Sequence, residues 1–325
     1  MDKLNFSIFC AGYIAETMAK TVSQMDEVVP YAIAARNSDR AQNLAEKYGF
    51  QKSYGSYDEL VNDADVDLVY IASPHSHHYE HAKLCLMHGK HVLCEKPFTV
   101  NAKQAEELFR LAKSKNLFIA EAVWTRFQPF AAKLHELIDS GQIGELHTLT
   151  ASFGENLTHI ERIVSPELAG GSLLDQGIYT LTFASMFFGA EIKKIESAAV
   201  KSDRGVDAQD SIILSYQDGR MALLNSSFLC KMKNQGIIYG SKGRIEVEPF
   251  WHPEVIRVYL NDESEPQVFQ VPFDITGYEY EVRAVVKAIE QGERDCAQIP
   301  HEETLRILKI MDQLRNDWGI QYPFE

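Results

Sequence analysis

The chain has 325 residues, 45% of them hydrophobic and 24% charged, which is enough for a sizeable core and about two domains. Its formal net charge of −14 argues against nucleic acid or an anionic membrane as the main partner. The five cysteines form no CxxC pair, no apolar run is long enough to span a bilayer, and the first residues lack a signal-peptide pattern. We therefore expect a cytoplasmic protein with reduced thiols.

The first third of the chain alternates short apolar runs with helical segments. Repeated βαβ units of this length predict a parallel sheet with right-handed crossovers. Ser38 stands where the N-cap of the second helix is expected. Strands are predicted at residues 6–10, 28–35, 66–72, 91–95 and 117–122, and helices at 14–25, 39–48, 78–88 and 102–115.

After Thr125 the pattern changes to successive strands with few helices between them. Asp218-Gly219 and Ser241-Lys242-Gly243 are hairpin signals, which favour an antiparallel or mixed sheet. The sequence thus predicts an α/β doubly wound domain at 1–123 and an α+β domain at 124–325. Strands of the second domain are predicted at 147–153, 194–200, 211–216, 220–228, 235–239, 244–247 and 255–259, and helices at 129–140, 173–188, 279–291 and 302–318.

A degenerate dinucleotide-binding fingerprint follows the first predicted strand. The run Cys10-Ala11-Gly12-Tyr13-Ile14-Ala15 has cysteine at the first glycine position and alanine at the last. Gly12 lets the backbone approach a pyrophosphate, and the helix that follows supplies N–H donors for the phosphates. An ordinary strand-to-helix turn would look similar, so this signal alone is weak.

The end of the second strand carries arginine where NAD-binding folds have an acidic residue that holds the ribose hydroxyls. Arg36 stands there and Arg40 follows four positions later. A guanidinium suits a 2′-phosphate, so we expect NADP in preference to NAD. The alternative is a pair of solvated arginines at a helix start.

Six histidines crowd residues 75–91, and His77 and His81 have the i, i+4 spacing of a metal pair on a helix. No third ligand is evident, so no metal site is predicted. Ser73-Pro74-His75 follows the third long strand and lies at the ligand edge of the sheet. His75 is expected to touch the cofactor, and His78 to face the substrate or nearby backbone, with a core or capping histidine as the alternative.

The segment Cys94-Glu95-Lys96-Pro97 places an ammonium group at the carboxyl end of a parallel strand, where ligands bind in open α/β sheets. In the second domain, Asp175 and Tyr179 are four residues apart on one predicted helix. Tyr179 is the candidate general acid/base, and Lys96 would favour its phenolate near neutral pH. Asp175 would orient the lysine or a substrate hydroxyl. The alternative is a tyrosine on a buried helix face.

Taken together, these motifs resemble the Gfo/Idh/MocA oxidoreductase family. They are most similar to its branch of dimeric dihydrodiol dehydrogenases and NADP-dependent D-xylose dehydrogenases. The first fingerprint glycine and the histidine that many wider-family members have at position 179 are absent here. The runs that carry the resemblance are C-A-G-Y-I-A at 10–15, A-A-R-N-S-D-R-A at 34–41, S-P-H-S-H-H at 73–78, C-E-K-P at 94–97, E-A-V-W-T-R-F at 121–127 and G-G-S-L-L-D-Q-G-I-Y at 170–179.

The resemblance implies a Rossmann domain followed by a domain with a large, open, mostly antiparallel sheet whose face forms a homodimer. It implies hydride transfer between NADP and the hydroxyl or carbonyl of a sugar, polyol or trans-dihydrodiol. Lys96, Tyr179, Asp175 and His78 match the family's catalytic positions. The expected substrate contacts are Trp124, Arg126, Phe153 and Trp251, and the expected cofactor contacts are Cys10, Gly12, Tyr13, Ile14, Arg36, Arg40, Ser73, Pro74, His75, Glu95 and Lys96.

Two other functions remain compatible with this sequence. A non-catalytic NADP sensor or regulatory protein could use the same fold, although it would have no need of Lys96, Asp175 and Tyr179 together. A metal-dependent hydrolase could use the histidine cluster.

Overall fold

The computed structural model describes residues 3–325, which form two compact units. Unit 1 combines Met1–Phe127 with Asp274–Lys309, and unit 2 combines Gln128–Phe273 with Ile310–Glu325. The sequence suggested a single boundary near Val123. The segment after Phe273 instead returns to unit 1, because apolar residues of helix α9 (Glu279–Glu290), Val282 and Val285 among them, pack into the core of that unit.

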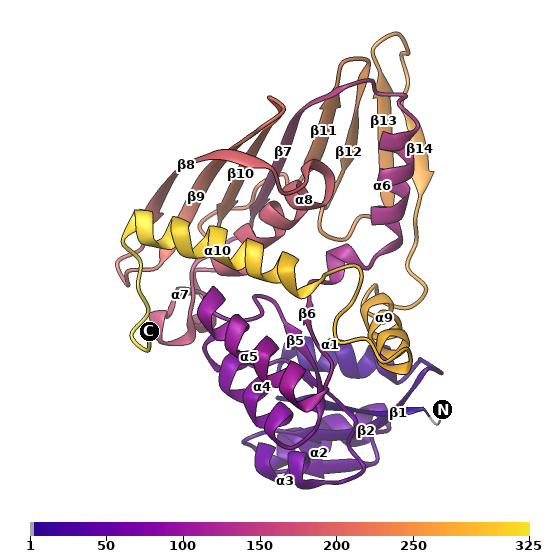
Figure 1. The fold of residues 1–325 in the computed structure, drawn as a ribbon, viewed down its shortest axis with the longest axis vertical. Coiled ribbons are helices and arrows are strands. Elements are labelled where there is room, and N and C mark those ends of the chain that lie inside the picture. The colour runs from indigo at the N-terminus through magenta and orange to yellow at the C-terminus, as the bar shows by residue number, and fades with distance from the viewer. Residues whose placement is uncertain (1–2) are drawn as a thin grey trace. The chain divides into compact units, whose positions relative to one another are not determined.

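Unit 1 contains a six-stranded parallel sheet in the order β3-β2-β1-β4-β5-β6, which confirms the predicted doubly wound fold (Figure 1). The strand order reverses between β1 and β4, and the carboxyl ends of strands at such a point form a ligand crevice. The strands are β1 (Leu4–Phe9), β2 (Val28–Ala34), β3 (Lys52–Tyr54), β4 (Leu68–Ile71), β5 (His91–Glu95) and β6 (Ile119–Ala122).

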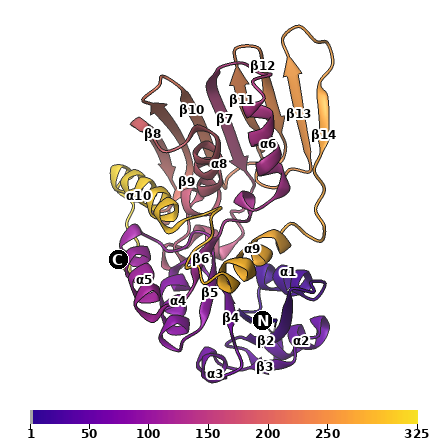
Figure 2. The same ribbon diagram turned by 45° about the vertical axis from the view of Figure 1, so that its right-hand side comes forward.

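The helices of unit 1 connect these strands, and α9 lies beside α1 in both ribbon views (Figures 1 and 2). The N-cap of α2 is Asn37 and not Ser38, because the Asn37 side chain accepts the N–H of Arg40 at 3.0 Å. Among residues 3–325, no helix combines the length and apolar character needed to cross a membrane. The helices are α1 (Tyr13–Val22), α2 (Ser38–Tyr48), α3 (Tyr57–Asn62), α4 (His78–Met87), α5 (Ala102–Lys115) and α9, while α10 (His301–Trp318) runs through both units.

Unit 2 contains an eight-stranded sheet in the order β14-β13-β12-β11-β7-β10-β9-β8. Its pairs are antiparallel except for β7 with β10, which confirms the mostly antiparallel sheet that the hairpin signals predicted. The strands are β7 (Leu146–Gly154), β8 (Ile192–Lys201), β9 (Asp207–Tyr216), β10 (Met221–Ser227), β11 (Gly236–Gly240), β12 (Gly243–Val247), β13 (Val255–Leu260) and β14 (Gln267–Gln270).

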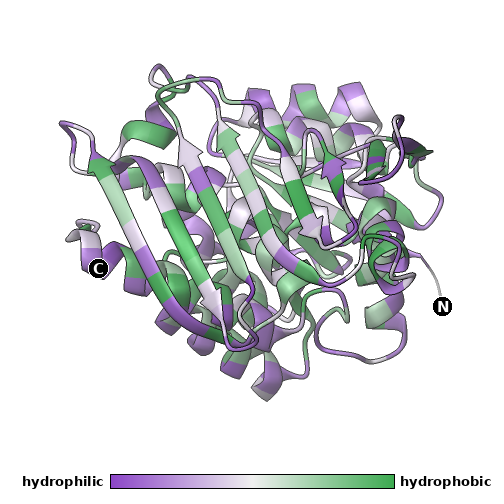
Figure 3. Cartoon of the chain, turned by 90° about the horizontal axis from the view of Figure 1, so that it is seen from above, coloured by the Kyte–Doolittle hydropathy of each residue, from purple (hydrophilic) through white to green (hydrophobic). Residues whose placement is uncertain are grey.

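Helices α6 (Pro129–Asp139) and α8 (Ile178–Phe188) cover one face of this sheet (Figures 1 and 2). Hydrophobic and hydrophilic residues alternate along its strands, as a sheet with one covered face requires (Figure 3). The approach of α8 is close at Gly236 in β11, where a Cβ atom would lie 2.7 Å from the ring of Phe183. Glycine at this position therefore allows α8 to pack directly on the sheet.

The predicted helix at 173–188 is interrupted, because its first turn is the π-helical turn η4 (Leu173–Gly177) and only then does α8 begin. Single π turns inside helices are frequent at functional sites. The Asp207 carboxylate accepts the backbone N–H of Leu173 at 2.6 Å. Gly171 has φ of +120°, and a Cβ atom there would lie 2.3 Å from the same carboxylate, so only glycine fits before this turn.

Asp207 is fully buried, and burial raises its pKa to about 7. The unfolded chain holds the same carboxyl near its ordinary value of about 3.9. Between these two values the folded protein keeps a proton that the unfolded chain has released, so this group favours folding at low pH and ceases to do so as the pH rises through 7.

We expect Asp207→Asn to become more stable relative to the wild type as the pH rises from 5 to 8.5. The asparagine still accepts the N–H of Leu173 but never carries a charge. The difference between the two unfolding free energies should grow by about 3 kcal/mol between pH 5 and pH 7 and should level off above pH 7. Urea unfolding at several pH values measures this difference. Asp203→Asn, at an exposed position, is the control and should show no such trend; a pH-independent difference for Asp207→Asn would contradict the prediction.

Candidate active site

The turn after β1 has the backbone of a dinucleotide-binding fingerprint although its first glycine is replaced. Cys10 adopts φ of +81°, in the left-handed region that favours glycine, and its N–H donates to the carbonyl of Ala34 at 2.8 Å. Its thiol lies 3.0 Å from the Tyr57 hydroxyl, and burial raises the pKa of Cys10. Backbone strain of this kind costs about 1–3 kcal/mol and is found mainly at ligand-binding sites.

Gly12 is the N-cap of α1, and a Cβ atom added there would meet no atom within 4 Å. Packing within the chain therefore does not explain the glycine. The open space lies in front of the N-terminus of α1, where unpaired N–H groups and the helix dipole favour an anion. Ala15, at the last fingerprint position, is fully buried, as close packing of helix and strand requires. The turn therefore fits a pyrophosphate-containing cofactor.

Both candidate 2′-phosphate residues lie just beyond β2. Arg36 is exposed. Arg40 is in the first turn of α2 and donates from Nη2 to the carbonyl of Ala11 at 2.9 Å, which ties α2 to the fingerprint turn. The positive charge of Arg36 acts to lower the pKa of Cys10, of Tyr57 and of His81, so Arg36 belongs to the region of that turn. The residues present thus fit a cofactor with a phosphate on its ribose.

The His78 side chain bonds to the backbone inside unit 1 and is not exposed at its surface. Its side chain is fully buried, with Nδ1 2.8 Å from the carbonyl oxygen of Pro97 and Nε2 2.8 Å from that of Ser73. Burial lowers the pKa of His78 to about 4, although the two carbonyls favour the charged ring. Of the two orientations considered from sequence, toward substrate or toward backbone, the structure has the second. His78 is therefore a positioning residue that joins the segments after β4 and β5.

The neighbouring histidines also make contacts within the protein. His75 is buried and packs edge-on to His78, with ring centroids 5.8 Å apart. His81 Nδ1 lies 2.9 Å from the Ser73 hydroxyl, and burial lowers the pKa of His81 to about 4. The rings of His77 and His81 are 5.7 Å apart. Within residues 3–325, no three histidine, cysteine, aspartate or glutamate side chains gather as metal ligands would.

Lys96 follows β5 directly, and buried side chains form hydrogen bonds with the backbone on both sides of it. The buried Glu95 accepts the hydroxyl of Tyr70, in β4, and the backbone N–H of Lys96 at 3.1 Å. On the other side, the N–H of Phe98 donates to Glu121 of β6 at 3.0 Å. Lys96 itself is half-buried, at the carboxyl edge of the sheet. Side chains from three adjacent strands thus fix the backbone of Lys96.

Two of the expected substrate contacts belong to unit 1 and have partners there. Trp124 stacks on Tyr278, with ring centroids 4.1 Å apart and planes 18° apart. Arg126 forms an ion pair with Glu303 of α10, and both side chains are largely buried. Burial lowers the pKa of Arg126. The sequence offered no signal for these pairings, since the partners are more than 150 residues away.

In unit 2, Asp175 lies in the π-helical turn and is nearly buried. The guanidinium of Arg162, in the short helix α7 (Glu161–Val164), donates to Asp175 Oδ1 at 2.7 Å. Sequence reasoning missed Arg162, because an arginine in a polar loop carries no distinguishing pattern. The pair places a positive charge, 46% exposed, next to the acidic residue of the D-x-G-x-Y run.

Tyr179, in the first turn of α8, belongs to a group of aromatic rings in unit 2. Phe153 near the end of β7 and Trp251 stack face to face, with centroids 3.8 Å apart and planes 8° apart. The ring of Tyr179 lies 5.7 Å from Phe153 and 6.4 Å from Trp251. Phe153 and Trp251 are both partly exposed. Tyr179 therefore borders a flat aromatic surface that can take the apolar face of a ring.

The structure brings the predicted residues together in two groups. Unit 1 holds the fingerprint turn, Arg36, Arg40, the Ser73–His75 segment, Lys96, Trp124 and Arg126, whereas unit 2 holds Phe153, Asp175, Tyr179 and Trp251. The first group can bind a dinucleotide, and the second combines a phenol, an ion pair and an aromatic surface.

Comparison with known proteins identifies both parts of the chain. Residues 4–122 match the model of the oxidoreductase family with an NAD-binding Rossmann fold, and residues 131–246 match the GFO/IDH/MocA C-terminal domain. Trans-1,2-dihydrobenzene-1,2-diol dehydrogenase of Bos taurus is 36% identical, and that of Homo sapiens 33%, each over 98% of both chains.

Solved structures agree with these matches. KijD10, a 3-ketoreductase from Actinomadura kijaniata in complex with NADP and TDP-benzene, superposes with a TM-score of 0.86 at 27% identity, over 97% of this chain and 98% of that one. Aldose-aldose oxidoreductase from Caulobacter crescentus shares the fold, with a TM-score of 0.87 at 22% identity and 97% coverage of both chains. The chain therefore belongs to the Gfo/Idh/MocA family of NAD(P)-binding oxidoreductases.

Proposed function

We propose that this protein is an NADP-dependent dehydrogenase that interconverts a hydroxyl and a carbonyl group on a sugar, a polyol or a trans-dihydrodiol. The observation that carries the proposal is Tyr179, a phenol bordered by the stacked rings of Phe153 and Trp251. The relatives named for dihydrodiol oxidation and the 3-ketoreductase with bound NADP support the same substrate class and cofactor.

The cofactor would be held by unit 1. Gly12 and the N-terminus of α1 suit the pyrophosphate, and Arg36 and Arg40 suit the 2′-phosphate. Ser73, Pro74, His75 and Glu95 lie at the carboxyl ends of β4 and β5, the edge at which the nicotinamide would lie. When bound, NADP accepts or supplies the hydride. An acidic residue at position 36 would repel the 2′-phosphate, so the arginine favours NADP over NAD.

In oxidation, Tyr179 accepts the proton of the substrate hydroxyl, and in reduction it returns a proton to the oxygen. An unperturbed phenol has a pKa of about 10, so it needs a nearby positive charge near neutral pH. We assign this role to the ammonium of Lys96, which also stabilises negative charge on the reacting oxygen. Arg162 neutralises Asp175, so the carboxylate does not oppose formation of the phenolate.

We further propose a cytoplasmic homodimer formed by the uncovered face of the sheet in unit 2. All five cysteines are free, as in a reducing compartment. Met221 and Leu223 of β10 are 40% and 37% exposed on this face. Leu223 pairs with Ile213 on one side and with Thr150 on the other, and Thr150 pairs in turn with Ile237. This continuous row of mostly apolar residues suits a second copy of the same face.

We expect Tyr179→Phe and Lys96→Met each to reduce kcat by about 10²- to 10⁴-fold while NADP binding persists, because each removes a group used in proton transfer. NADPH absorbance measures turnover on a panel of sugars, polyols and trans-dihydrodiols, and NADPH fluorescence measures binding. Tyr48→Phe, which removes a hydroxyl bonded to Glu16 on the surface of unit 1, is the control and should keep wild-type kcat. Full turnover by Lys96→Met would refute its catalytic role. A wild-type protein that binds NADPH but turns over nothing in the panel would favour a sensor.

We expect Arg36→Ala to raise the KM for NADP by about 10- to 100-fold, since it removes a charge-assisted contact with a phosphate. The KM for NAD should change little, because NAD has no 2′-phosphate. Steady-state kinetics with both cofactors measure the two constants on the same preparation, so NAD serves as the internal control. An equal loss with both cofactors would argue against recognition of the 2′-phosphate by Arg36.

We expect the wild type to be a dimer in solution and Leu223→Asp to be a monomer, because two aspartates at a symmetric interface are buried without partners. Size-exclusion chromatography with light scattering at several protein concentrations measures the mass. Met87→Asp, which alters an exposed apolar residue of unit 1, is the matched control and should stay dimeric. A wild-type monomer at 0.1 mM, or a Leu223→Asp dimer, would exclude this interface.

A further inference from the structure

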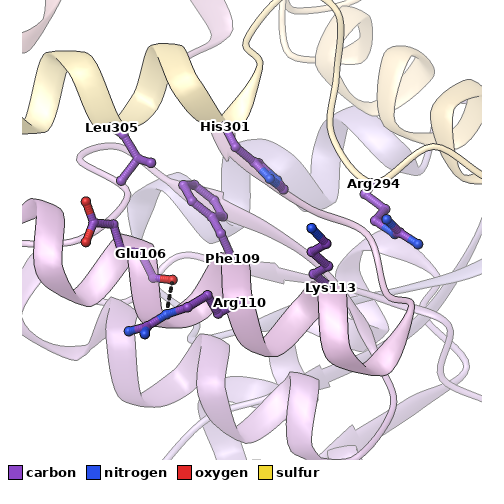
Figure 4. Close-up of a pocket in the computed structure, with 7 residues that line it drawn as sticks. All are labelled: Glu106, Phe109, Arg110, Lys113, Arg294, His301 and Leu305. Atoms are coloured by element: carbon purple, nitrogen blue, oxygen red, sulfur yellow. Dashed lines mark hydrogen bonds between the residues drawn. The ribbon is translucent and has the colours of Figure 1, made fainter.

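A pocket of about 480 Å³ lies on the flank of unit 1, between one face of α5 and the start of α10. Its volume is within the range of small-molecule sites. Residues of α5 at i, i+3, i+4 and i+7 form one wall, while His301 and Leu305 of α10 and Arg294 of the preceding connection form the other (Figure 4). The four residues of α5 are Glu106, Phe109, Arg110 and Lys113.

The pocket shares no lining residue with the fingerprint turn or with Lys96, and its end at Lys113 and Arg294 lies toward the amino edge of the sheet. Helix α5 leaves the carboxyl end of β5 and returns the chain to the start of β6, so its last turns lie at the amino edge. The carbonyl of Arg294 accepts the N–H of Ile119, the first residue of β6, at 3.2 Å. The pocket is thus separate from the proposed cofactor site.

A rigid stack of rings forms the apolar surface of this pocket. The rings of Phe109 and His301 are 3.9 Å apart with planes 13° apart, and Phe98 stacks behind Phe109 at 4.9 Å. His301 Nε2 lies 2.8 Å from the carbonyl of Ile119, which fixes the ring plane. Burial lowers the pKa of His301, so the ring is neutral near pH 7 and offers a flat surface with no charge of its own.

Within residues 3–325, three exposed cations lie around the stack without a carboxylate partner. Arg110 Nε donates to the backbone carbonyl of Glu106 at 3.2 Å, and Arg294 donates to the side-chain oxygen of Asn116 at 3.2 Å. The ammonium group of Lys113 makes no hydrogen bond or ion pair within residues 3–325. The Glu106 carboxylate is instead paired with Lys309, outside the pocket, at 3.1 Å. Figure 4 shows Lys113 and Arg294 on one side of the ring stack.

Arg110, Lys113 and Arg294 are exposed to solvent, and their positive charges gather around an uncharged ring stack. Arg110 and Lys113 are like charges three residues apart on one helix face, which destabilises the helix. The dipole of α5 favours a cation near its end, but it does not account for Arg294, which comes from a different segment. The chain as a whole carries a formal charge of −14, so a pocket lined by three cations without carboxylate partners differs from the acidic average of the chain.

We propose that this pocket binds a small aromatic anion, that is, a flat ring that carries a carboxylate or a phosphate group. The ring packs against His301, which Phe109 supports from behind, and against Leu305, and the anionic group bonds to Lys113 and Arg294. Neither the proposed reaction nor the family assignment requires such a site. We expect binding here to be independent of the cofactor, because the pocket shares no residue with the fingerprint turn.

The test is calorimetric titration of the full-length protein saturated with NADP. Benzoate and AMP serve as probes for a carboxylate and a phosphate on a ring, and inorganic phosphate serves as an anion without a ring. We expect saturable binding of one ring-bearing anion per chain, and binding of inorganic phosphate at least about tenfold weaker. No saturation by either ring-bearing probe, equal affinity for inorganic phosphate, or binding only when NADP is absent would overturn the proposal.

Paired variants identify the site. Lys113→Met with Arg294→Gln removes two charges but keeps unbranched side chains, and it should weaken binding at least about tenfold. Lys103→Met with Lys115→Met removes the same net charge from exposed positions of α5 outside the pocket, and it should bind like the wild type. Thermal melting verifies that both proteins are folded. Equal weakening in the two double variants would mean a general charge effect and would contradict the proposed site.

Discussion

The carboxyl edge of the sheet in unit 1 depends on buried polar side chains that bond to the backbone at the ends of β4, β5 and β6. Beyond their paired residues, strands leave N–H and C=O groups that must find partners once they are buried. Glu95, His78 and Glu121 supply those partners for the segment 95–98 and for Ser73. The backbone of Lys96 is therefore held from three strands, and only its side chain remains adjustable.

In unit 2, a buried carboxylate also bonds to the backbone that carries the candidate residues. Asp207 accepts the first N–H of the π-helical turn, and Ser172 and Ser226 bond to each other behind it at 2.8 Å. Burial raises the pKa of both Asp207 and Glu121 to about 7, because the charged form of each carboxyl is unfavourable in its buried position. Such groups contribute less to net stability than apolar residues would, and what they provide is a defined backbone geometry for Asp175 and Lys96.

Some arginines of this acidic chain are paired with carboxylates, and others are exposed to solvent. Arg126 and Arg162 are each paired with a carboxylate, Glu303 and Asp175 respectively, whereas Arg36 is exposed beside the fingerprint turn. Paired arginines fix local geometry, and an arginine left beside a helix N-terminus and an open glycine remains available to an anion. The same reasoning separates the proposed anion pocket from ordinary surface lysines, since there the cations flank a rigid ring stack.

The sequence by itself determined the two kinds of sheet and the order of most elements, because hydrophobic periodicity and turn residues act over short stretches of chain, and its motifs supplied the candidate site residues. Tertiary structure alone decided that His78 bonds to backbone, that Arg162 pairs with Asp175, and that the turn at Leu173–Gly177 is π-helical. It also decided that α9 joins the core of unit 1. These features depend on partners that are distant in sequence or on a local geometry that packing imposes. Such dependences leave no periodic signal in the sequence.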